Sequence, residues 1–488
     1  MKKIAFAAMT IIALLALLVS GCGAPAAEPT PTPPPPEDTP TPPPPEPTPT
    51  EAGPVEGTPY KLGFCAAATG GGSSLGMPER NTAEMIAAQL EEAGGVVGPD
   101  GAVHEVEVII YDTESTPDIA SSVVTRLIEE DEVDAIVCGT LSGNSLAIVP
   151  LIEEAEVPYV SMASARSIIL NAETGESYAW SFKTPQENLH SGVWQALWAE
   201  HMGWETVCDL YENTGYGQDC LANTQVAMDE VGIEVVYTDS FERTDTEFPQ
   251  MAGVTGSGCD ALVIGSIPPG ASMATVAARE VAPELPVVHG HGVCNQTFID
   301  LAGEAAEGVV LPCGKLMYAE LLPDEDPQKE FLLQYIEDYT EFTDGEPIDT
   351  FGGHAMDAIS WVLEAMESLD EGMTLEERRA AIRDYIETEI KDWPGTGGVF
   401  NITPDDHLGL TYEALGFVKV ENGTWVYFPP EEWGEEPEAA APEIPHPVEG
   451  QETCLVCHET GVAGATQIPS GHEGIAEDAC TTCHQPAP

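Results

Sequence analysis

Val133-Asp-Ala-Ile-Val-Cys138, followed at once by Gly139-Thr-Leu-Ser-Gly-Asn144, is the stretch that decides the fold. The first six residues are mostly apolar, which predicts a buried strand, and the next six are small or polar, which predicts a loop. Apolar residues at helical spacing over 145–154 predict a helix, and residues 157–161 predict another strand. A strand, loop, helix and strand in this order indicate a parallel sheet that is covered by helices.

The same alternation extends over the body of the chain, residues 60–428. Each strand is a short apolar or β-rich run, and each helix has apolar residues on one face. The expected strands are 60–66, 106–111, 133–138, 157–161, 206–210, 233–238 and 261–264, and the expected helices include 83–90, which ends at Gly94-Gly95, 123–128, 145–154 and 218–231. Roughly 370 residues exceed one compact core, so we expect an α/β fold of two doubly wound lobes.

Small polar loops follow several of these strands, where open α/β sheets bind their ligands. In the first of them, the Ser142 hydroxyl and backbone N–H groups around Gly143 are suited to hold a carboxylate at the positive end of the next helix. Loops 162–165 and 211–217 occupy similar positions. Composition alone favours ordinary glycine and serine turns at all three positions.

Residues 60–428 resemble the substrate-binding proteins of branched-chain amino acid uptake systems, the Leu/Ile/Val-binding type with the type I periplasmic-binding fold. The resemblance rests on the order and spacing of these motifs: Ala93-Gly94-Gly95, Tyr111-Asp112, Val157-Pro158-Tyr159-Val160-Ser161, Tyr216-Gly217 and Phe351-Gly352-Gly353-His354-Ala355-Met356-Asp357-Ala358. It implies two lobes that close on a small ligand like a hinge. It places 60–180 and 288–395 in the first lobe, and 181–287 and 396–428 in the second.

The resemblance also implies roles for individual residues. Ser142 and Ser164 would face the ligand carboxylate, with backbone from Ala163. Tyr216 would close from the second lobe, and Ser266 would line the far wall. Family members that bind amino acids usually place an acidic residue in the second lobe, but loops 265–270 and 289–294 contain none. A carboxylate without an ammonium group therefore fits at least as well as an amino acid.

Sequence patterns for other chemistry are weak in the body. His289 and His291 are more simply turn residues beside the cleft than metal ligands, because only Cys294 is a nearby candidate ligand. No Ser-His-Asp arrangement, Walker loop or paired-carboxylate motif stands out. We therefore expect a binding protein and no catalysis.

The N-terminus has the features of an exported lipoprotein. Residues 1–21 combine two lysines with an apolar run and end in Leu18-Val-Ser-Gly21, which resembles a lipobox, so Cys22 would carry the lipid. An uncleaved anchor helix is the alternative. More than half of residues 25–49 are proline, which makes 22–59 a linker of polyproline character. We expect the protein to be anchored to the outer face of a bacterial cell membrane, in the periplasm or at the cell surface.

The C-terminal segment 446–488 contains two Cys-x-x-Cys-His motifs, the pattern that attaches c-type haem. A zinc ribbon is the alternative, but zinc does not require a histidine directly after each cysteine pair. The segment also resembles paired-haem units of bacterial multihaem cytochromes. The attachment residues would be Cys454, Cys457, Cys480 and Cys483; the iron ligands would be His458 and His484, with His446 and His472 as the spare histidines. No methionine follows Met373, so we expect two bis-His haems of low potential that transfer electrons. An acidic proline-rich linker, 429–445, precedes this dihaem module.

Charge and cysteine content restrict the partners and the compartment. The chain has 16 Lys and Arg against 83 Asp and Glu, a formal net charge of −67, so we expect no nucleic acid partner. Outside the signal and haem segments, seven cysteines allow at most three disulfides, which the sequence cannot assign. These are Cys65, Cys138, Cys208, Cys220, Cys259, Cys294 and Cys313.

Together these features predict an anchored solute-binding protein with an electron-transferring tail. The body would capture a small carboxylate or amino acid for an ABC permease, and the two haems c would exchange electrons with a partner cytochrome. An extracellular redox protein with the body as scaffold is one alternative. A haem-based sensor, in which closure of the cleft alters the haems, is another.

Overall fold

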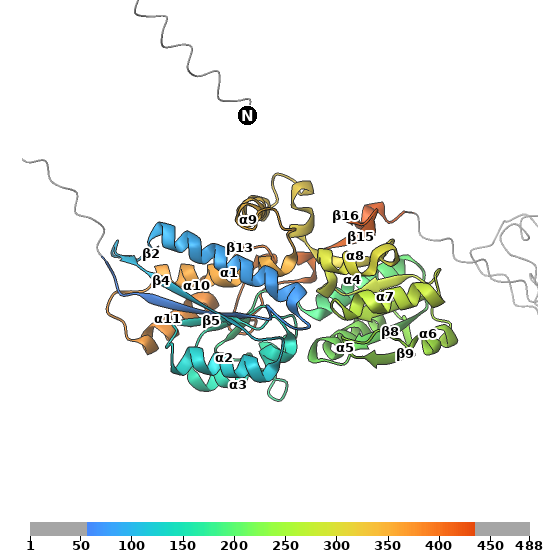
Figure 1. The fold of residues 1–488 in the computed structure, drawn as a ribbon, viewed down its shortest axis with the longest axis horizontal. Coiled ribbons are helices and arrows are strands. Elements are labelled where there is room, and N and C mark those ends of the chain that lie inside the picture. Colours follow the sequence, from blue (N-terminus) through green and yellow to red (C-terminus); the bar gives the residue numbers. More distant parts are fainter. Residues whose placement is uncertain (1–55, 435–488) are drawn as a thin grey trace, which may run out of the picture. The chain divides into compact units, whose positions relative to one another are not determined.

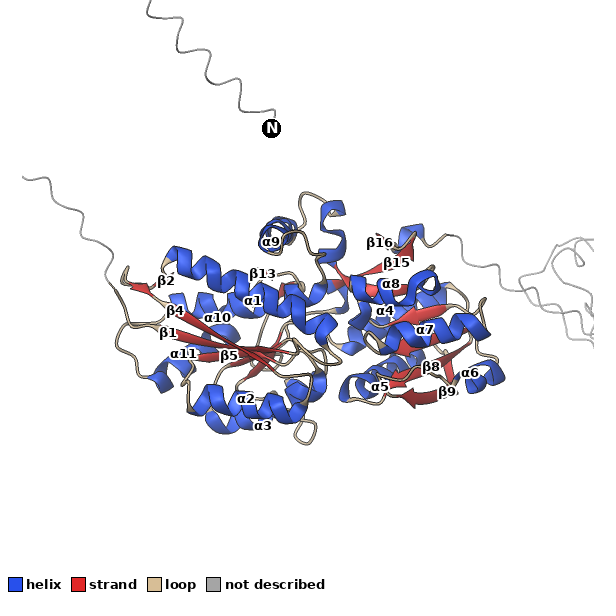
Figure 2. Cartoon of the chain, in the orientation of Figure 1, coloured by secondary structure: helices blue, strands red, loops and turns tan. Residues whose placement is uncertain are grey.

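Two parallel sheets, each covered by helices, form the part of the chain that the computed structural model describes, residues 56–434 (Figures 1 and 2). The lipoprotein signal, Cys22, most of both linkers and the dihaem segment therefore lie outside the described residues. No helix within 56–434 is long and apolar enough to span a bilayer. The expected α/β fold of two doubly wound lobes is confirmed for this part of the chain.

The first lobe is organised around a five-stranded sheet with the order β4-β1-β5-β6-β7, in which all neighbouring strands are parallel. Its strands are β1 (Tyr60–Ala66), β4 (Val106–Asp112), β5 (Ala135–Cys138), β6 (Tyr159–Ser161) and β7 (Ser181–Lys183). Its helices are α1 (Ser73–Ala93), α2 (Pro117–Glu129), α3 (Ser142–Ala155), α9 (Lys329–Phe342), α10 (Thr350–Glu367) and α11 (Leu375–Glu389). Helices α1 and α10 pack together on one face of the sheet, and α2 and α3 pack together on the other (Figure 1).

The second lobe contains a seven-stranded sheet with the order β16-β15-β12-β11-β10-β8-β9. Only its last two strands in the sequence, β15 and β16, run antiparallel to their neighbours. Its strands are β8 (Thr206–Glu212), β9 (Glu234–Phe241), β10 (Ala261–Gly265), β11 (Val287–His289), β12 (Val310–Gly314), β15 (Leu415–Glu421) and β16 (Thr424–Tyr427). Its helices are α4 (Asn188–His201), α5 (Gly215–Glu230), α6 (Met251–Ser257), α7 (Gly270–Val281) and α8 (Gln296–Ala302).

Short elements complete the described chain. Two-stranded sheets pair β2 (Val96–Val97) with β3 (Val103–His104), and β13 (Trp393–Pro394) with β14 (Val399–Phe400). The 3-10 turns are η1 (Arg166–Ile168), η2 (His291–Val293), η3 (Gly303–Ala306), η4 (Lys315–Leu321), η5 (Tyr412–Ala414) and η6 (Pro430–Glu432).

The chain crosses between the lobes three times, and these crossings correct the expected lobe boundaries. They follow β7, β12 and the segment after β14. We expected residues 288–314 in the first lobe, but β11 and β12 belong to the second sheet. The expectation that residues 396–410 lie in the second lobe is also wrong, because His407 bonds to Ser181 in β7 of the first sheet. A crossing has no distinctive local sequence, so its position depends on which sheet accepts the next strand.

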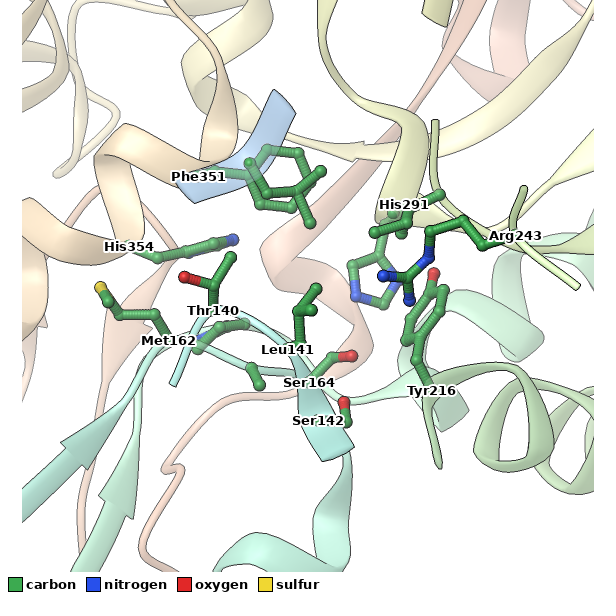
Figure 3. A pocket seen from close by; sticks show the side chains of 15 residues that line it. Thr140, Leu141, Ser142, Met162, Ser164, Tyr216, Arg243, His291, Phe351 and His354 are labelled. Carbon is green, nitrogen blue, oxygen red and sulfur yellow. The ribbon is translucent and has the colours of Figure 1, made fainter. Parts of the chain in front are cut away.

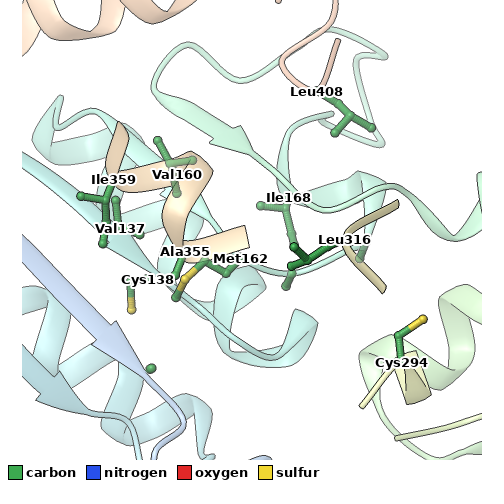
Figure 4. Close-up of a cluster of buried hydrophobic side chains, with 14 of the residues drawn as sticks. Val137, Cys138, Val160, Met162, Ile168, Cys294, Leu316, Ala355, Ile359 and Leu408 are labelled. Carbon is green, nitrogen blue, oxygen red and sulfur yellow. The ribbon is translucent and has the colours of Figure 1, made fainter. Parts of the chain in front are cut away.

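The core of the first lobe shows why these residues form these elements. Val137 and Val160 lie on adjacent buried strands, and α10 covers that face of the sheet with Ala355 and Ile359 (Figure 4). All four side chains are fully buried. A strand that is covered on both faces must be apolar throughout, which accounts for the continuous apolar run 135–138.

Three disulfides form among the seven cysteines that the sequence left unassigned. They join Cys65 to Cys138, Cys208 to Cys259, and Cys294 to Cys313. Cys65 and Cys138 lie side by side on the neighbouring strands β1 and β5. Cys220 is buried and forms no disulfide with another cysteine of residues 56–434. Three bridges are typical of an oxidising compartment outside the cytoplasm.

Candidate functional site: a pocket between the lobes

Residues of both lobes surround one pocket at the carboxyl ends of the strands (Figure 3). Its cavity volume is about 30 Å³, room for at most a few water molecules, so a larger ligand requires the lobes to open wider than they are in this structure. The lining consists of Leu75, Thr140, Leu141, Ser142, Met162, Ala163, Ser164, Pro185, Tyr216, Arg243, Ile267, His291, Gly292, Phe351 and His354. This set contains hydroxyl groups, two imidazoles, one guanidinium group and several apolar side chains, but no carboxylate.

The first-lobe wall of the pocket begins where β5 ends. Gly139 turns the chain with a φ of 90°, which favours glycine, and α3 starts at Ser142. No side chain in the described part of the chain caps this helix. Its first N–H groups and the positive end of its dipole are therefore available to an anion in the pocket.

Thr140, next to that helix start, is fixed by two hydrogen bonds. Its hydroxyl donates to the carboxyl group of Glu79 and accepts the N–H of Ala67 at 2.8 Å. Burial raises the pKa of Glu79 well above its usual range. This network supports the loop from behind.

Ser164 and Ala163 extend the wall from the end of β6. The Ala163 N–H already donates to the Ser161 hydroxyl at 3.1 Å. The Ser164 carbonyl accepts a hydrogen bond at 2.7 Å from Lys183, whose side chain is fully buried. Lys183 also donates to the Pro185 carbonyl at 2.9 Å. A buried ammonium group thus lies directly beneath two residues of the pocket lining.

Two neutral histidines approach the pocket from different elements. His354 comes from α10 and His291 from η2, and Figure 3 shows both rings beside the space. Burial lowers the pKa of each to about 3, and Lys183 contributes to both shifts. The Nδ1 atom of each ring is buried and has no hydrogen-bond partner among residues 56–434. Both imidazoles can therefore offer hydrogen bonds to a ligand.

The second-lobe wall is built from Tyr216 and Arg243. The Tyr216 hydroxyl is buried without a hydrogen-bond partner in the described chain. Arg243 follows β9 and donates through Nε to Glu212 Oε2 at 3.1 Å and through Nη2 to Oε1. Glu212, at the end of β8, is fully buried. The second lobe therefore does contain an acidic residue near the pocket. It lies in loop 211–217, outside loops 265–270 and 289–294, where the resemblance led us to expect it, and Arg243 stands between it and the lining.

The lobes touch at the edge of the pocket, where two helices begin. A Cβ on Gly215, the first residue of α5, would lie 3.6 Å from the Gly143 backbone nitrogen at the start of α3. A Cβ on Gly71 would lie 3.6 Å from Cδ of Arg243. Arg243 thus reaches from the second lobe to a glycine loop of the first, as expected for a closed cleft.

The structure brings four of the six ligand-binding residues expected from the sequence into one lining: Ser142, Ala163, Ser164 and Tyr216. Gly143 and Ser266 are outside it. Ser266 instead donates to Glu212 at 2.9 Å, so it supports the second-lobe wall from behind. His291 lines the pocket, whereas His289 bonds to the Thr275 hydroxyl at 2.8 Å.

Arg243, Thr140 and Lys183 are the main residues that sequence reasoning missed. Thr140 lies in the loop 139–144 that was predicted to bind the ligand, but no role was predicted for its own side chain. The rarity of basic residues was the available signal for the other two, since Lys and Arg number only 16. Within residues 56–434 no group of three His, Cys, Asp or Glu side chains is arranged to bind a metal ion. The haem residues and Cys22 lie outside the described residues.

Comparisons with known proteins agree with this geometry. The sequence model of the family described as "Periplasmic binding protein" matches residues 59–424. An extracellular ligand-binding receptor from Rhodopseudomonas palustris HaA2 superposes with a TM-score of 0.69 at 25% identity, over 76% of this chain and 99% of that one. A leucine binding protein from Thermotoga maritima MSB8 shares the fold, with a TM-score of 0.63 at 23% identity over 76% and 99% of the two chains. An amino acid binding protein from Pseudomonas aeruginosa is 20% identical over 268 residues, 54% of this chain and 68% of that one.

Proposed function

The chain belongs to the periplasmic binding protein family, and from this premise we propose that it captures a small carboxylate between its lobes and delivers it to an ABC-type permease. The observation that supports this most is the first-lobe wall, where an uncapped helix start, Ser142 and Ser164 meet in a lining without any carboxylate. One of the similar structures is a branched-chain amino acid transporter substrate binding protein, LivJ of Streptococcus pneumoniae, in complex with isoleucine. Capture by closure of two lobes requires no catalysis.

The charge distribution favours an acid over an amino acid. Lys183 lies beneath the first-lobe wall, and Arg243 stands in the second. An ammonium group would meet neither a free carboxylate nor a negative helix end in this lining. Glu212, the acidic group that holds Arg243, already accepts hydrogen bonds from Arg243, Thr214, Ser266 and Ile267. A carboxylate without an ammonium group is the ligand class that these contacts favour.

Location outside the cytoplasm and attachment to a membrane are part of the proposal. The lipobox-like sequence that ends at Cys22 supports a lipid anchor, and the proline-rich segment 22–59 supports a tether between the anchor and the binding body, 60–428. Radiolabelled fatty acid should be incorporated by the natural chain and not by a Cys22→Ala variant. Equal labelling of the two chains would contradict lipidation at Cys22.

Titration calorimetry with matched ligands tests the binding proposal. We expect short carboxylic acids to bind the full-length protein and the corresponding amides to bind at least tenfold more weakly, because an amide lacks the charge that the helix start attracts. Amino acids of the same carbon skeleton should bind more weakly than the acids. Equal binding of acid and amide, or no binding of any acid at millimolar concentration, would contradict the proposal.

A second function is proposed for the C-terminal dihaem module, 446–488: electron exchange with a partner cytochrome through two haems c. Its support is the pair of Cys-x-x-Cys-His motifs and two further histidines in one short segment without methionine. The residues concerned are Cys454, Cys457, His458, Cys480, Cys483, His484, His446 and His472. The bound haem would supply reversible one-electron chemistry, and these histidines would hold the iron.

Spectroscopy tests this second function directly. The reduced protein should show the sharp α-band of low-spin haem c, and two irons per chain by elemental analysis. Single His446→Ala and His472→Ala variants should each convert one haem to a high-spin spectrum. Bound zinc and no haem absorbance would contradict the proposal. A haem potential that stays the same when an acid binds would count against the sensor alternative.

A further inference from the structure

Arg243 is the one charged side chain of the pocket lining, and it is held in place by a fully satisfied partner. The Glu212 carboxylate accepts hydrogen bonds from Nε and Nη2 of Arg243. It also accepts hydrogen bonds from the Thr214 hydroxyl at 2.6 Å, the Ser266 hydroxyl at 2.9 Å and the Ile267 N–H at 3.3 Å. The Glu212 side chain is 0% exposed and that of Arg243 is 13% exposed. The carboxylate of Glu212 is therefore occupied by hydrogen bonds within the protein, and the guanidinium group of Arg243 is the member of the pair that a ligand can contact.

The guanidinium group has hydrogen-bonding capacity left over. Glu212 occupies Nε and Nη2, and within residues 56–434 Nη1 has no acceptor. Figure 3 shows the group between His291 and Tyr216, on the same side of the pocket. The Tyr216 hydroxyl and His291 Nδ1 are also buried without partners. Three polar groups without a partner in the described chain thus lie together on the second-lobe side of the pocket.

Buried polar groups without partners cost free energy unless a ligand satisfies them. Apolar side chains, among them Leu75, Leu141, Ile267 and Phe351, occupy the rest of the lining. The two walls together therefore present more hydrogen-bonding groups than one carboxylate, with about four acceptor sites, can satisfy. A ligand with a single polar end would leave the second-lobe groups unsatisfied when the cleft closes.

We infer that the second-lobe wall is an anchor for a second oxygen-bearing group, so that the ligand is a carboxylate with a hydroxyl, carbonyl or carboxyl oxygen at its far end. This rests on the proposed function, since it takes the first carboxylate to sit at the start of α3. An oxygen accepts hydrogen bonds from Arg243 and Tyr216, whereas an ammonium group there faces a like charge. The protein thus discriminates against amine-ended acids at the far end.

Linear acids that differ only in their far end test the inference. The probes are acids of four to seven carbons that end in a methyl, hydroxyl, carboxylate or ammonium group, titrated calorimetrically into the full-length protein. Hydrogen bonds to a charged group contribute enough for about tenfold in affinity. We expect the best hydroxyl-ended or carboxylate-ended acid to bind about tenfold more tightly than its methyl-ended counterpart, and the ammonium-ended acid to bind weakest.

Variants of the Arg243–Glu212 pair test whether the second-lobe wall causes the preference for oxygen-ended over methyl-ended acids. Arg243→Gln combined with Glu212→Gln removes both charges and leaves no buried carboxylate unpaired, while Arg243→Lys keeps the positive charge. In the double variant the preference for an oxygen-ended acid should fall from about tenfold to about one, and in Arg243→Lys it should fall only in part. Arg126→Gln, which removes an exposed arginine of the first lobe, is the control and should keep the full preference. Circular dichroism verifies that each variant is folded.

The possible outcomes separate the two proposals. Methyl-ended acids that bind as well as oxygen-ended ones overturn the second anchor and leave the carboxylate-binding function standing. Tightest binding of the ammonium-ended acid, or a preference that survives the double variant, also overturns it. If none of the probes binds at millimolar concentration, the proposed function and this inference both fail.

Discussion

The two walls of the pocket present their polar groups to the ligand space in different ways. The first-lobe wall is built from the loops after two neighbouring strands, β5 and β6. Its proposed binding groups are N–H groups of α3 and the small hydroxyls Ser142 and Ser164. The second-lobe wall depends on long side chains from separate loops, with Arg243 held by Glu212 and Tyr216 standing on α5. A wall of backbone has its geometry fixed by the sheet, whereas a wall of side chains needs supporting residues behind it.

This difference predicts where the molecule is fragile. Removing a hydroxyl from the first wall leaves the helix start in place. Removing one member of the second wall leaves its partner buried and unsatisfied. Substitutions that distinguish the walls should therefore affect binding in the first lobe, and both binding and stability in the second.

The largest effect is expected for Glu212→Gln. This change leaves the Arg243 guanidinium group without its carboxylate partner in a site where Glu212 is fully buried. Breaking one side of a buried ion pair costs about 3–5 kcal/mol. The free energy of unfolding, measured by urea denaturation, should fall by about 3 kcal/mol. The combined Glu212→Gln and Arg243→Gln variant should regain much of that loss.

The matched control lies in the first lobe. Glu84→Gln removes a carboxylate that pairs with Arg80, but both side chains are about 40% exposed, at 39% and 42%. Exposed pairs contribute little, so this variant should lose less than about 1 kcal/mol. Equal losses for Glu212→Gln and Glu84→Gln would show that the second wall does not depend on its buried support.

Ser142→Asp should have the next largest effect, mainly on binding. An aspartate in the first turn of α3 interacts favourably with the helix dipole, which offsets part of the cost of a charge at this buried position, so the fold should lose little stability. The same charge occupies the position proposed for the ligand carboxylate. We expect affinity for the best acid to drop about 100-fold or more by calorimetry. Ser122→Asp on α2, an exposed position away from the pocket, adds the same charge and should leave affinity unchanged. A drop of less than tenfold for Ser142→Asp would move the carboxylate elsewhere.

The contrast between the walls also determines what could be predicted from the sequence. Strand β1 was expected at residues 60–66 and is Tyr60–Ala66, and α1 ends where Gly94 adopts a left-handed φ of 82°. Ser142 and Ser164 could be found because each directly follows a buried strand of a parallel sheet. These features depend on residues that are close in the sequence.

Arg243, and its pairing with Glu212, could not be found in this way. The two residues are 31 positions apart and meet only because β8 and β9 are neighbours in the second sheet. An acidic residue carries little information in a chain with 83 of them. The lobe boundaries were missed for a similar reason, since the partners of β11 and β12 are set by the sheet and not by the strands themselves.

Lys183 should give the first-lobe wall a pH dependence. Burial lowers its pKa from 10.5 to about 8, against the opposing influence of Glu187 and Asp219. Below pH 8 the ammonium group is charged and attracts a bound carboxylate; above it the charge is lost. Affinity for an acid should therefore be nearly constant from pH 6 to 7.5 and fall as the pH rises through about 8. His291 and His354 should not contribute, because burial holds the pKa of each near 3.

Lys183→Met tests that assignment. The variant should bind the acid about tenfold more weakly at pH 7 and should lose the decline above pH 8, because one nearby positive charge is gone. Lys419→Met on β15 removes the same charge from the second lobe without lining the pocket and should keep both affinity and pH profile. An unchanged pH profile in Lys183→Met would show that another group titrates.

The smallest effect is expected for Gly143→Ala, which compares the tolerance of the two walls. A Cβ on Gly143 would have no atom within 4 Å, whereas a Cβ on Gly292 would lie 2.3 Å from the Tyr216 hydroxyl oxygen. Alanine in place of glycine favours a helix by up to about 1 kcal/mol, so Gly143→Ala should be slightly more stable and bind within about twofold of the natural protein.

Gly292→Ala must displace the Tyr216 ring and should weaken binding of oxygen-ended acids about tenfold. If both variants bound equally well, the Tyr216 ring would have room to move, and the geometry of the second wall would not depend on close packing against Gly292. If Gly143→Ala alone abolished binding, the ligand would have to approach the α3 backbone so closely that a methyl group blocks it, which would add Gly143 to the binding residues.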